Sequence, residues 1–230
     1  MSQLEMKEQS VVVPGDILAK GMDYLPGEGT YRTDENIRAN RLGLLRVSGR
    51  ALKIIPLAGV YLPREGDNVI GQVVDITLQG WRVELFCAFS SMLMTKDATT
   101  DFIAKGSDLT KYFDIGDYIV AKISHVSSQN LIDLSTKGPG LRKLQGGRIF
   151  RINSTKVPRV IGKNGSMVSL IKEATGCKIV VGQNGLIWID GEPEMEQLAF
   201  DTIKMIESRS HVSGLTEEVK TFLSEHNPKK

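Results

Sequence analysis

Residues 160–191 read VIGKNGSMVSLIKEATGCKIVVGQNGLIWIDG and contain the pattern Gly-x-Asn-Gly twice, at 162–165 and at 182–185. The second copy separates two β-rich runs, CKIVV and LIWID. We interpret it as a solvent-facing hairpin turn of type I′, because Asn-Gly is the strongest short signal for that turn and both positions tolerate positive φ.

The first copy, at 162–165, instead joins two predicted helices. A helix that begins at Gly165 exposes unpaired backbone N–H groups and the positive end of its dipole beside the loop. The two glycines let a sugar-phosphate backbone lie against the main chain, and Lys163 adds a positive charge. A plain helix-to-helix turn is the alternative, but the surroundings favour a phosphate-binding loop.

The flanking segments complete a mixed α and β pattern. GRIFRIN, residues 147–153, predicts a strand, and the short helix that follows it is limited by Pro158. A second helix over 165–175 ends where Gly176 offers a left-handed cap. Two strands and a last helix that starts near Pro193 give the order βααββα.

The sequence VIGKNGSMVSLIKEATGCKI, residues 160–179, resembles the core signature of a KH domain. In that family the GxxG loop clamps about four nucleotides of single-stranded nucleic acid. The resemblance implies a type I KH domain over 138–210, in which Asn164 replaces a frequent glycine and tolerates positive φ. The predicted RNA-binding residues are those of the loop and the neighbouring cations, Gly162, Lys163, Asn164, Gly165, Arg148, Arg151, Lys156 and Arg159.

The middle of the chain, residues 64–137, predicts a five-stranded barrel of the OB type. Its candidate strands are NVIGQVVDI, WRVELF, AFSSMLM, DYIVAKISHV and NLIDLS. The segments 71–85 and 113–137 are similar to the first and last strands of the S1 domain, an RNA-binding OB fold. KGPGLRKLQGG, residues 137–147, then predicts a linker.

The S1 resemblance implies RNA contacts by Arg82, Lys122 and His125. Two positions that usually offer aromatic platforms hold Gln79 and Arg82, with Trp81 between them. Trp81 is equally compatible with a base-stacking platform and with a place in the core.

Residues 1–63 predict a small all-β unit, since short apolar runs alternate with PGD, PGEG and SGR turns. The predicted fold is therefore multidomain and mainly β, with an α+β C-terminal domain. Residues 211–230 remain an unassigned C-terminal tail.

The net charge of +2 conceals two long segments that contain no Asp or Glu. One covers 36–64 and carries six cations, whereas the other covers 134–172 and carries nine. The second segment flanks the predicted loop. Such segregation of charge favours a phosphate-rich partner over a merely solvated surface.

Other chemistry is poorly supported. Cys87 and Cys177 stand far apart, and the three histidines share no ligand spacing, so we expect no metal or cofactor. No Walker, HExxH or GxSxG motif is present, which leaves a nuclease with unrecognised carboxylates as the enzyme hypothesis. The start of the chain lacks a signal segment and no run is apolar enough for a membrane span, so we expect a cytoplasmic protein.

The order of a β-rich N-terminal unit, an S1 domain and a KH domain resembles the KH-bearing RNA-binding cap subunits of the archaeal exosome. This resemblance implies a non-catalytic protein. Three such caps sit on a six-membered ring of RNase PH-type subunits and feed single-stranded RNA to its pore for 3′-to-5′ degradation. The alternative is a free-standing RNA-binding or translation-associated protein built from the same modules.

Overall fold

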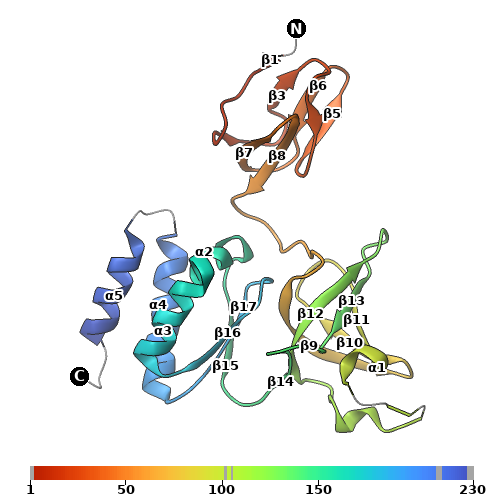
Figure 1. The fold of residues 1–230 in the computed structure, drawn as a ribbon, viewed down its shortest axis with the longest axis vertical. Helices are drawn as coiled ribbons and strands as arrows, with labels where there is room; N and C mark the ends of the chain where they lie inside the picture. Colours follow the sequence, from red (N-terminus) through yellow and green to blue (C-terminus); the bar gives the residue numbers. More distant parts are fainter. Residues whose placement is uncertain (1–2, 101–102, 105, 211–213, 227–230) are drawn as a thin grey trace. The chain divides into compact units, whose positions relative to one another are not determined.

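The computed structural model describes residues 3–100, 103–104, 106–210 and 214–226. The chain divides into two compact units, Met1–Gly59 and Val60–Lys230 (Figure 1). In its described residues, 3–59, the first unit contains strands and no helix, and the second unit contains a β-barrel followed by an α+β domain. The predicted class, mainly β with an α+β C-terminal domain, is confirmed.

The first unit consists of two four-stranded sheets, ordered β1-β3-β6-β5 and β2-β7-β8-β4. Burial alternates along β6, β7 and β8, and the inward side chains of the unit share a core that includes Leu18, Ile37, Leu45 and Leu52. The strands are β1 Gln3–Leu4, β2 Val11–Val12, β3 Ile17–Lys20, β4 Leu25–Pro26, β5 Thr30–Thr33, β6 Asn36–Ala39, β7 Gly43–Ser48 and β8 Ala51–Pro56.

The second unit opens with a closed barrel of the OB type, as predicted. The sheet closes into a barrel because β13 pairs with both β11 and β12. In addition, β14 pairs with β12 and extends the sheet there. This last strand falls inside the segment predicted as a linker. The barrel strands are β9 Asn68–Thr77, β10 Gly80–Glu84, β11 Ser91–Met94, β12 Tyr118–Val126, β13 Ile132–Ser135 and β14 Lys143–Leu144, with short helices α1 Thr95–Ala98 and η1 Leu109–Lys111.

Trp81 lies in the barrel core rather than on its surface. Its relative exposure is 0%, and its indole N–H donates to the carbonyl oxygen of Phe113 at 2.9 Å. The Phe113 ring meets it edge to face, with 5.2 Å between the ring centroids. Of the two interpretations that the sequence leaves open, the structure supports the core.

The α+β domain has the predicted order βααββα, with an antiparallel sheet β15-β17-β16. Asn153 begins the helical segment by accepting a hydrogen bond from the backbone N–H of Thr155, and Gly176 ends α3 at φ 69°. The elements are β15 Arg148–Arg151, η2 Ser154–Lys156, α2 Val157–Ile161, η3 Lys163–Gly165, α3 Ser166–Thr175, β16 Lys178–Val181, β17 Leu186–Asp190 and α4 Pro193–Ser208.

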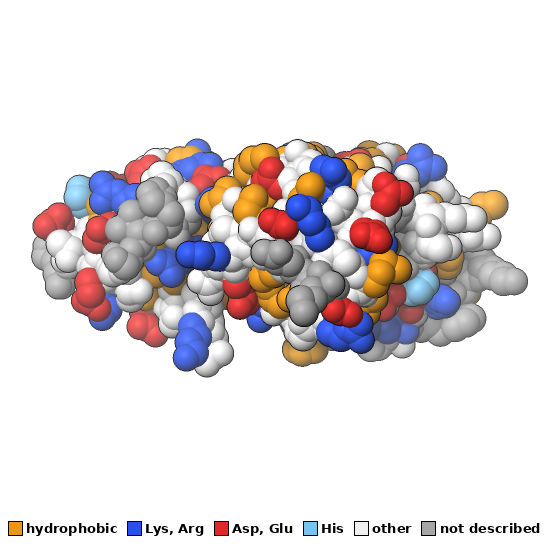
Figure 2. Space-filling model, turned by 90° about the horizontal axis from the view of Figure 1, so that it is seen from above, with side chains coloured by type: hydrophobic (Ala, Val, Ile, Leu, Met, Phe, Trp, Pro, Cys, Tyr) orange, Lys and Arg blue, Asp and Glu red, His pale blue; other side chains and the backbone are white. Residues whose placement is uncertain are grey.

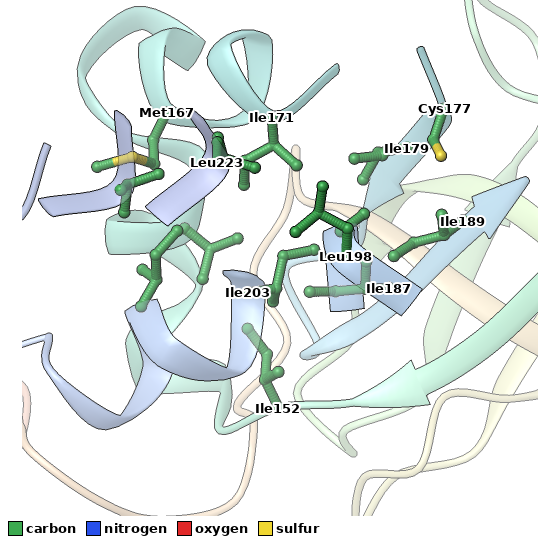
Figure 3. Close-up of a cluster of buried hydrophobic side chains, with 14 of the residues drawn as sticks. Ile152, Met167, Ile171, Cys177, Ile179, Ile187, Ile189, Leu198, Ile203 and Leu223 are labelled. Carbon is green, nitrogen blue, oxygen red and sulfur yellow. The ribbon is translucent and has the colours of Figure 1, made fainter. Parts of the chain in front are cut away.

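A further helix, α5 (Leu215–His226), follows within the segment that sequence analysis leaves unassigned. Its buried side chains, Leu215, Val219 and Leu223, join the same core as the KH-like elements (Figure 3). Figure 3 shows Leu223 beside Met167 and Ile171 of α3. None of the described helices is both long and apolar enough to cross a membrane.

Candidate nucleic-acid interface

The loop from Gly162 to Gly165 has a backbone that requires its glycines. Gly162 has φ 75°, and a Cβ there would lie 2.7 Å from the backbone nitrogen of Met167. Gly165 has open space around it but adopts φ 79°, and Asn164 lies in the left-handed region at φ 53°. Lys163 and Asn164 are exposed at the tip, so a ligand can reach both the main chain and the lysine.

The loop leads directly into α3, whose N-terminus is open to an anion. Gly165 at the N-cap provides no side-chain hydrogen bond, and the first turn contains no acidic residue. The orphan N–H groups and the positive end of the helix dipole therefore have no compensating group of α3 itself. A phosphate is the kind of group that such a helix end binds.

Two predicted cations, Lys156 and Arg159, lie on the elements that lead into this loop. Lys156 ends η2 and Arg159 belongs to α2, whose Val157 and Val160 are buried against the core. Arg159 is therefore on the exposed side of the helix. Together with Lys163, these residues provide positive charge on η2, α2 and the loop.

The other two cations predicted for this domain are used within the fold. Arg148 donates to Gln197 Oε1 at 3.1 Å, and its guanidinium lies 4.2 Å from the ring centroid of Phe200. Arg151 donates to the carbonyl oxygen of Phe86 in the barrel at 3.2 Å. Both contacts hold β15 against neighbouring elements, so these arginines do not gather at the loop.

Two of the barrel residues predicted to bind RNA lie beside acidic side chains. Arg82 is 3.6 Å from Asp75, and His125 Nδ1 is 2.6 Å from Glu65 Oε1. Hydrogen bonds from the Val126 backbone N–H and from His125 hold the pKa of the Glu65 carboxyl below its usual value.

Strand pairing relates these barrel residues to one another. The cross-strand partners around the wall run in the order Arg82, Met92, Asp133 and His125, so Met92 and the acidic Asp133 lie between Arg82 and His125. Lys122 is exposed beside Ser135. The barrel surface therefore mixes acids with bases. Figure 2 shows the same mixture of Lys and Arg with Asp and Glu over the face that it draws.

The second Gly-x-Asn-Gly copy is a turn between β16 and β17, but its predicted geometry and exposure are wrong. The N–H of Gly185 donates to the carbonyl of Gly182 at 3.0 Å, and only Gly185, at φ 87°, follows with positive φ. This pattern is a turn followed by a glycine bulge, not type I′, which needs positive φ at Asn184 as well. Asn184 is 1% exposed rather than facing solvent.

Asn184 is buried because it bonds to the barrel. Its Nδ2 donates to the carbonyl oxygens of Ile70 at 2.7 Å and Leu85 at 3.0 Å, and its Oδ1 accepts from the Ile70 N–H at 3.3 Å. The backbone N–H of Gln183 adds a bond to the carbonyl of Asn68 at 2.8 Å. The side-chain amide thus substitutes for a peptide group beside β9.

A small apolar cluster accompanies these hydrogen bonds. Ile70 and Val120 from the barrel and Leu144 from β14 pack with Leu186 and Trp188 of β17. The indole N–H of Trp188 donates to the carbonyl of Gly146 at 2.8 Å. The sequence does not predict this contact between the barrel and the β16–β17 turn. Its one local sign is an Asn placed between two glycines.

The described residues contain no group of three His, Cys, Asp or Glu side chains placed to hold a metal ion. The functional assignment depends on the charged and glycine-rich loop before α3.

Comparison with known proteins gives consistent results for each part of the chain. The family model described as the KH domain matches residues 148–210, and the model described as the Exosome complex exonuclease RRP4 N-terminal region matches residues 11–48. A solved structure described as an exosome complex RNA-binding protein is 32% identical, with a TM-score of 0.66 over 73% of this chain and 97% of that one.

Curated relatives match over nearly the full length. The exosome complex component Rrp4 of Pyrococcus furiosus is 43% identical over 227 residues, which cover 97% of this chain and 86% of the relative. The corresponding protein of Thermococcus kodakarensis is 41% identical over 97% of this chain and 88% of its own length. With such identity along almost its whole length, the chain belongs to the Rrp4 family of exosome complex components.

Proposed function

We propose that this protein is a non-catalytic RNA-binding cap of an exosome, which binds single-stranded RNA and delivers it to the pore of the degrading ring. One observation carries the proposal: an exposed loop whose glycines open the main chain stands at the uncompensated N-terminus of α3, next to Lys156, Arg159 and Lys163. The names of the curated relatives support the exosome as its context.

The loop can bind the phosphates of RNA, and such contacts do not depend on the base sequence. Phosphate oxygens approach the main chain where Gly162 and Gly165 lack side chains, beside the N-terminal turn of α3 and the positive end of its dipole. Lys163 neutralises charge, which makes the affinity dependent on salt. The bases then lie along the neighbouring surface, as in other KH domains.

Two of the acidic side chains after Asp190, Glu196 and Glu207, support a non-catalytic role, because their contacts hold the domain together. Glu196 accepts a hydrogen bond from the backbone N–H of Gly191 at 2.9 Å. Glu207 accepts from the N–H of Asn153 at 2.6 Å and pairs with Lys204 at 2.8 Å. Carboxylates in such contacts are poorly placed to hold catalytic metal ions on an RNA strand.

The finer parts of the proposal concern assembly and place. Three copies of the chain cap one six-membered ring of RNase PH-type subunits, and residues 1–63 dock on the ring while the barrel and the KH domain hold RNA. The protein works in the cytoplasm. A free-standing RNA-binding protein would use the same modules, but affinity purification in native salt would then recover no RNase PH-type subunits.

The test reverses charge at the loop tip. Lys163→Asp/Asn164→Asp places two carboxylates where phosphate is expected, so affinity for a short unstructured RNA should fall by about tenfold or more and depend less on salt. Filter binding at two salt concentrations measures both effects, and circular dichroism checks folding.

The control changes the same number of charges on the exposed side of α5. Lys220→Asp/Ser224→Asp should leave RNA affinity nearly unchanged apart from a salt-screened effect. Normal binding by the loop variant would contradict the proposed site. Cleavage products that persist when phosphate and magnesium are supplied to the highly purified wild-type chain would contradict the non-catalytic role.

A further inference from the structure

The chain contains two Asn-Gly dipeptides, Asn164-Gly165 and Asn184-Gly185, and both share a chemical weakness. In such a dipeptide the backbone nitrogen of the glycine can attack the side-chain carbonyl carbon of the asparagine, because glycine has no side chain to obstruct the approach. The structure places the two copies in opposite surroundings, so their reactivity should differ.

Asn164 lies where it can react. It is exposed at the loop tip, and within the described residues its side chain makes no hydrogen bond. The attack requires the Gly165 nitrogen to swing toward the Asn164 Cβ, away from the position set by ψ 30° at Asn164. The backbone hydrogen bond that opposes this rotation, from the Gly165 N–H to the Gly162 carbonyl, is long at 3.3 Å. A Cβ built on Gly165 would meet open space, so the loop has room to turn.

Charge around the loop favours the same reaction. The attacking nitrogen gives up its proton, so negative charge develops on Gly165 during the attack. Gly165 is the N-cap of α3, where the positive end of the helix dipole lies and the first turn carries no acidic residue. Lys163 adds a positive charge nearby in the same loop. Both stabilise the developing negative charge.

Asn184 is instead held in place against the barrel. It is 1% exposed, and its side-chain amide makes three hydrogen bonds, to the backbone groups of Ile70 and Leu85. A Cβ built on Gly185 would lie 2.4 Å from the carbonyl oxygen of Ile152, so this glycine is closely packed. The same reaction at Asn184 would first require a local opening that breaks these contacts.

We propose that Asn164 is a site of spontaneous deamidation, and that the carboxylate formed there weakens the hold of the loop on RNA. The effect on RNA rests on the proposed function. A bond forms between the Gly165 nitrogen and the Asn164 side-chain carbonyl carbon, and the bond from that carbon to the amide nitrogen breaks. The amide nitrogen takes the proton of the Gly165 N–H and leaves as ammonia. Water then opens the resulting succinimide at either carbonyl carbon, which gives aspartate or isoaspartate.

Either product changes the loop in the direction that repels RNA. A carboxylate replaces a neutral amide beside Lys163 and the N-terminus of α3, where phosphate is expected, and it offsets their positive charge. Isoaspartate also adds an atom to the main chain of a loop whose Asn164 and Gly165 both have positive φ. The affinity of the protein for RNA should therefore fall as the protein ages.

The experiment keeps the full-length chain in neutral buffer and samples it over several weeks. Peptide mass spectrometry follows the conversion of each asparagine, and a protein isoaspartyl methyltransferase with a labelled methyl donor detects isoaspartate. We expect Asn164 to convert at least about tenfold faster than Asn184, because opening at Asn184 breaks three hydrogen bonds. In filter binding, the converted protein should bind a short unstructured RNA about threefold or more weakly, as should freshly prepared Asn164→Asp.

The matched control is Asn164→Gln. It keeps a neutral amide at the loop tip, but its longer side chain cannot close the five-membered ring. Fresh and aged samples of this variant should therefore bind RNA equally, and circular dichroism checks that every sample is folded.

The possible failures are distinct. If Asn164 converts no faster than Asn184, the inference is overturned. If Asn164 converts without loss of affinity while Lys163→Asp/Asn164→Asp does lose affinity, only this inference is overturned. If neither ageing nor that double variant weakens binding, the proposed function of the loop is wrong and the effect on RNA falls with it. If aged Asn164→Gln loses affinity as the wild type does, damage elsewhere is the cause and the inference is again overturned.

Discussion

The Asn184 side chain allows a sharp test of how the KH domain is fastened to the barrel. Asn184→Ala removes three hydrogen bonds and leaves the N–H and carbonyl of Ile70 and the carbonyl of Leu85 without their partner. An intramolecular hydrogen bond contributes about 1 kcal/mol, and a buried group left unsatisfied costs about 1–3 kcal/mol. We therefore expect a loss of roughly 3 kcal/mol from the contact between the two domains, or about a hundredfold in its equilibrium.

Hydrogen exchange measured by mass spectrometry on the full-length chain reports this loss locally. Peptides that contain the Ile70 amide should exchange up to about a hundred times faster in the variant, because local opening needs that much less free energy. Asn164→Ala, in the other Gly-x-Asn-Gly copy, is the matched control. It affects an exposed residue with φ 53°, so the expected cost is only about 1 kcal/mol of backbone strain, and exchange at Ile70 should not change. Unaltered exchange at Ile70 in Asn184→Ala would refute the reasoning.

Two further predictions concern the barrel. Trp81→Phe should lower the free energy of unfolding by about 1–3 kcal/mol, because it opens space in the core and leaves the Phe113 carbonyl without a donor, while RNA affinity in filter binding stays unchanged; a folded variant with weakened RNA binding would restore the platform role. Burial, and then the hydrogen bond to Asp67, raise the pKa of the Tyr61 phenol well above its usual value. A raised pKa in the folded state gives a contribution to the free energy of unfolding that is complete below the pKa of the unfolded chain and is lost as the pH rises above it. Urea denaturation should therefore show a falling free energy of unfolding above about pH 10. This alkaline loss should be smaller in Tyr61→Phe.

Local patterns were sufficient to predict the elements of the KH domain. The periodicity of 165–175, the left-handed cap at Gly176 and Pro193 at the start of α4 all depend on residues a few positions apart. The same locality explains why the five barrel strands were found. Each alternates or runs apolar within its own segment.

The failures have a common physical cause. Asn184 bonds to Ile70, which is 114 positions away in the sequence, and its place between two glycines fits a plain turn equally well. Local turn propensity favoured type I′, but the tertiary contact selected a different turn and buried its tip. Helix α5 is amphipathic, with Leu215, Val219 and Leu223 on its buried side, but the surface that covers this side belongs to the rest of the domain and has no sign in the segment itself. The site residues remain a prediction for the binding experiments.

The seating of Asn184 against β9 also has a consequence for protein aggregation. β9 pairs with β12 along residues 68–72, where Asn68 lies opposite Lys122 and Gln72 lies opposite Tyr118. The pairing of β9 with β10 begins only at Gln72. Without the KH hairpin, the polar backbone groups of residues 68–70 would form a short open strand edge. Such edges template pairing with other chains. A barrel produced alone by truncation before the KH domain should therefore be prone to self-association, even if its own core folds correctly.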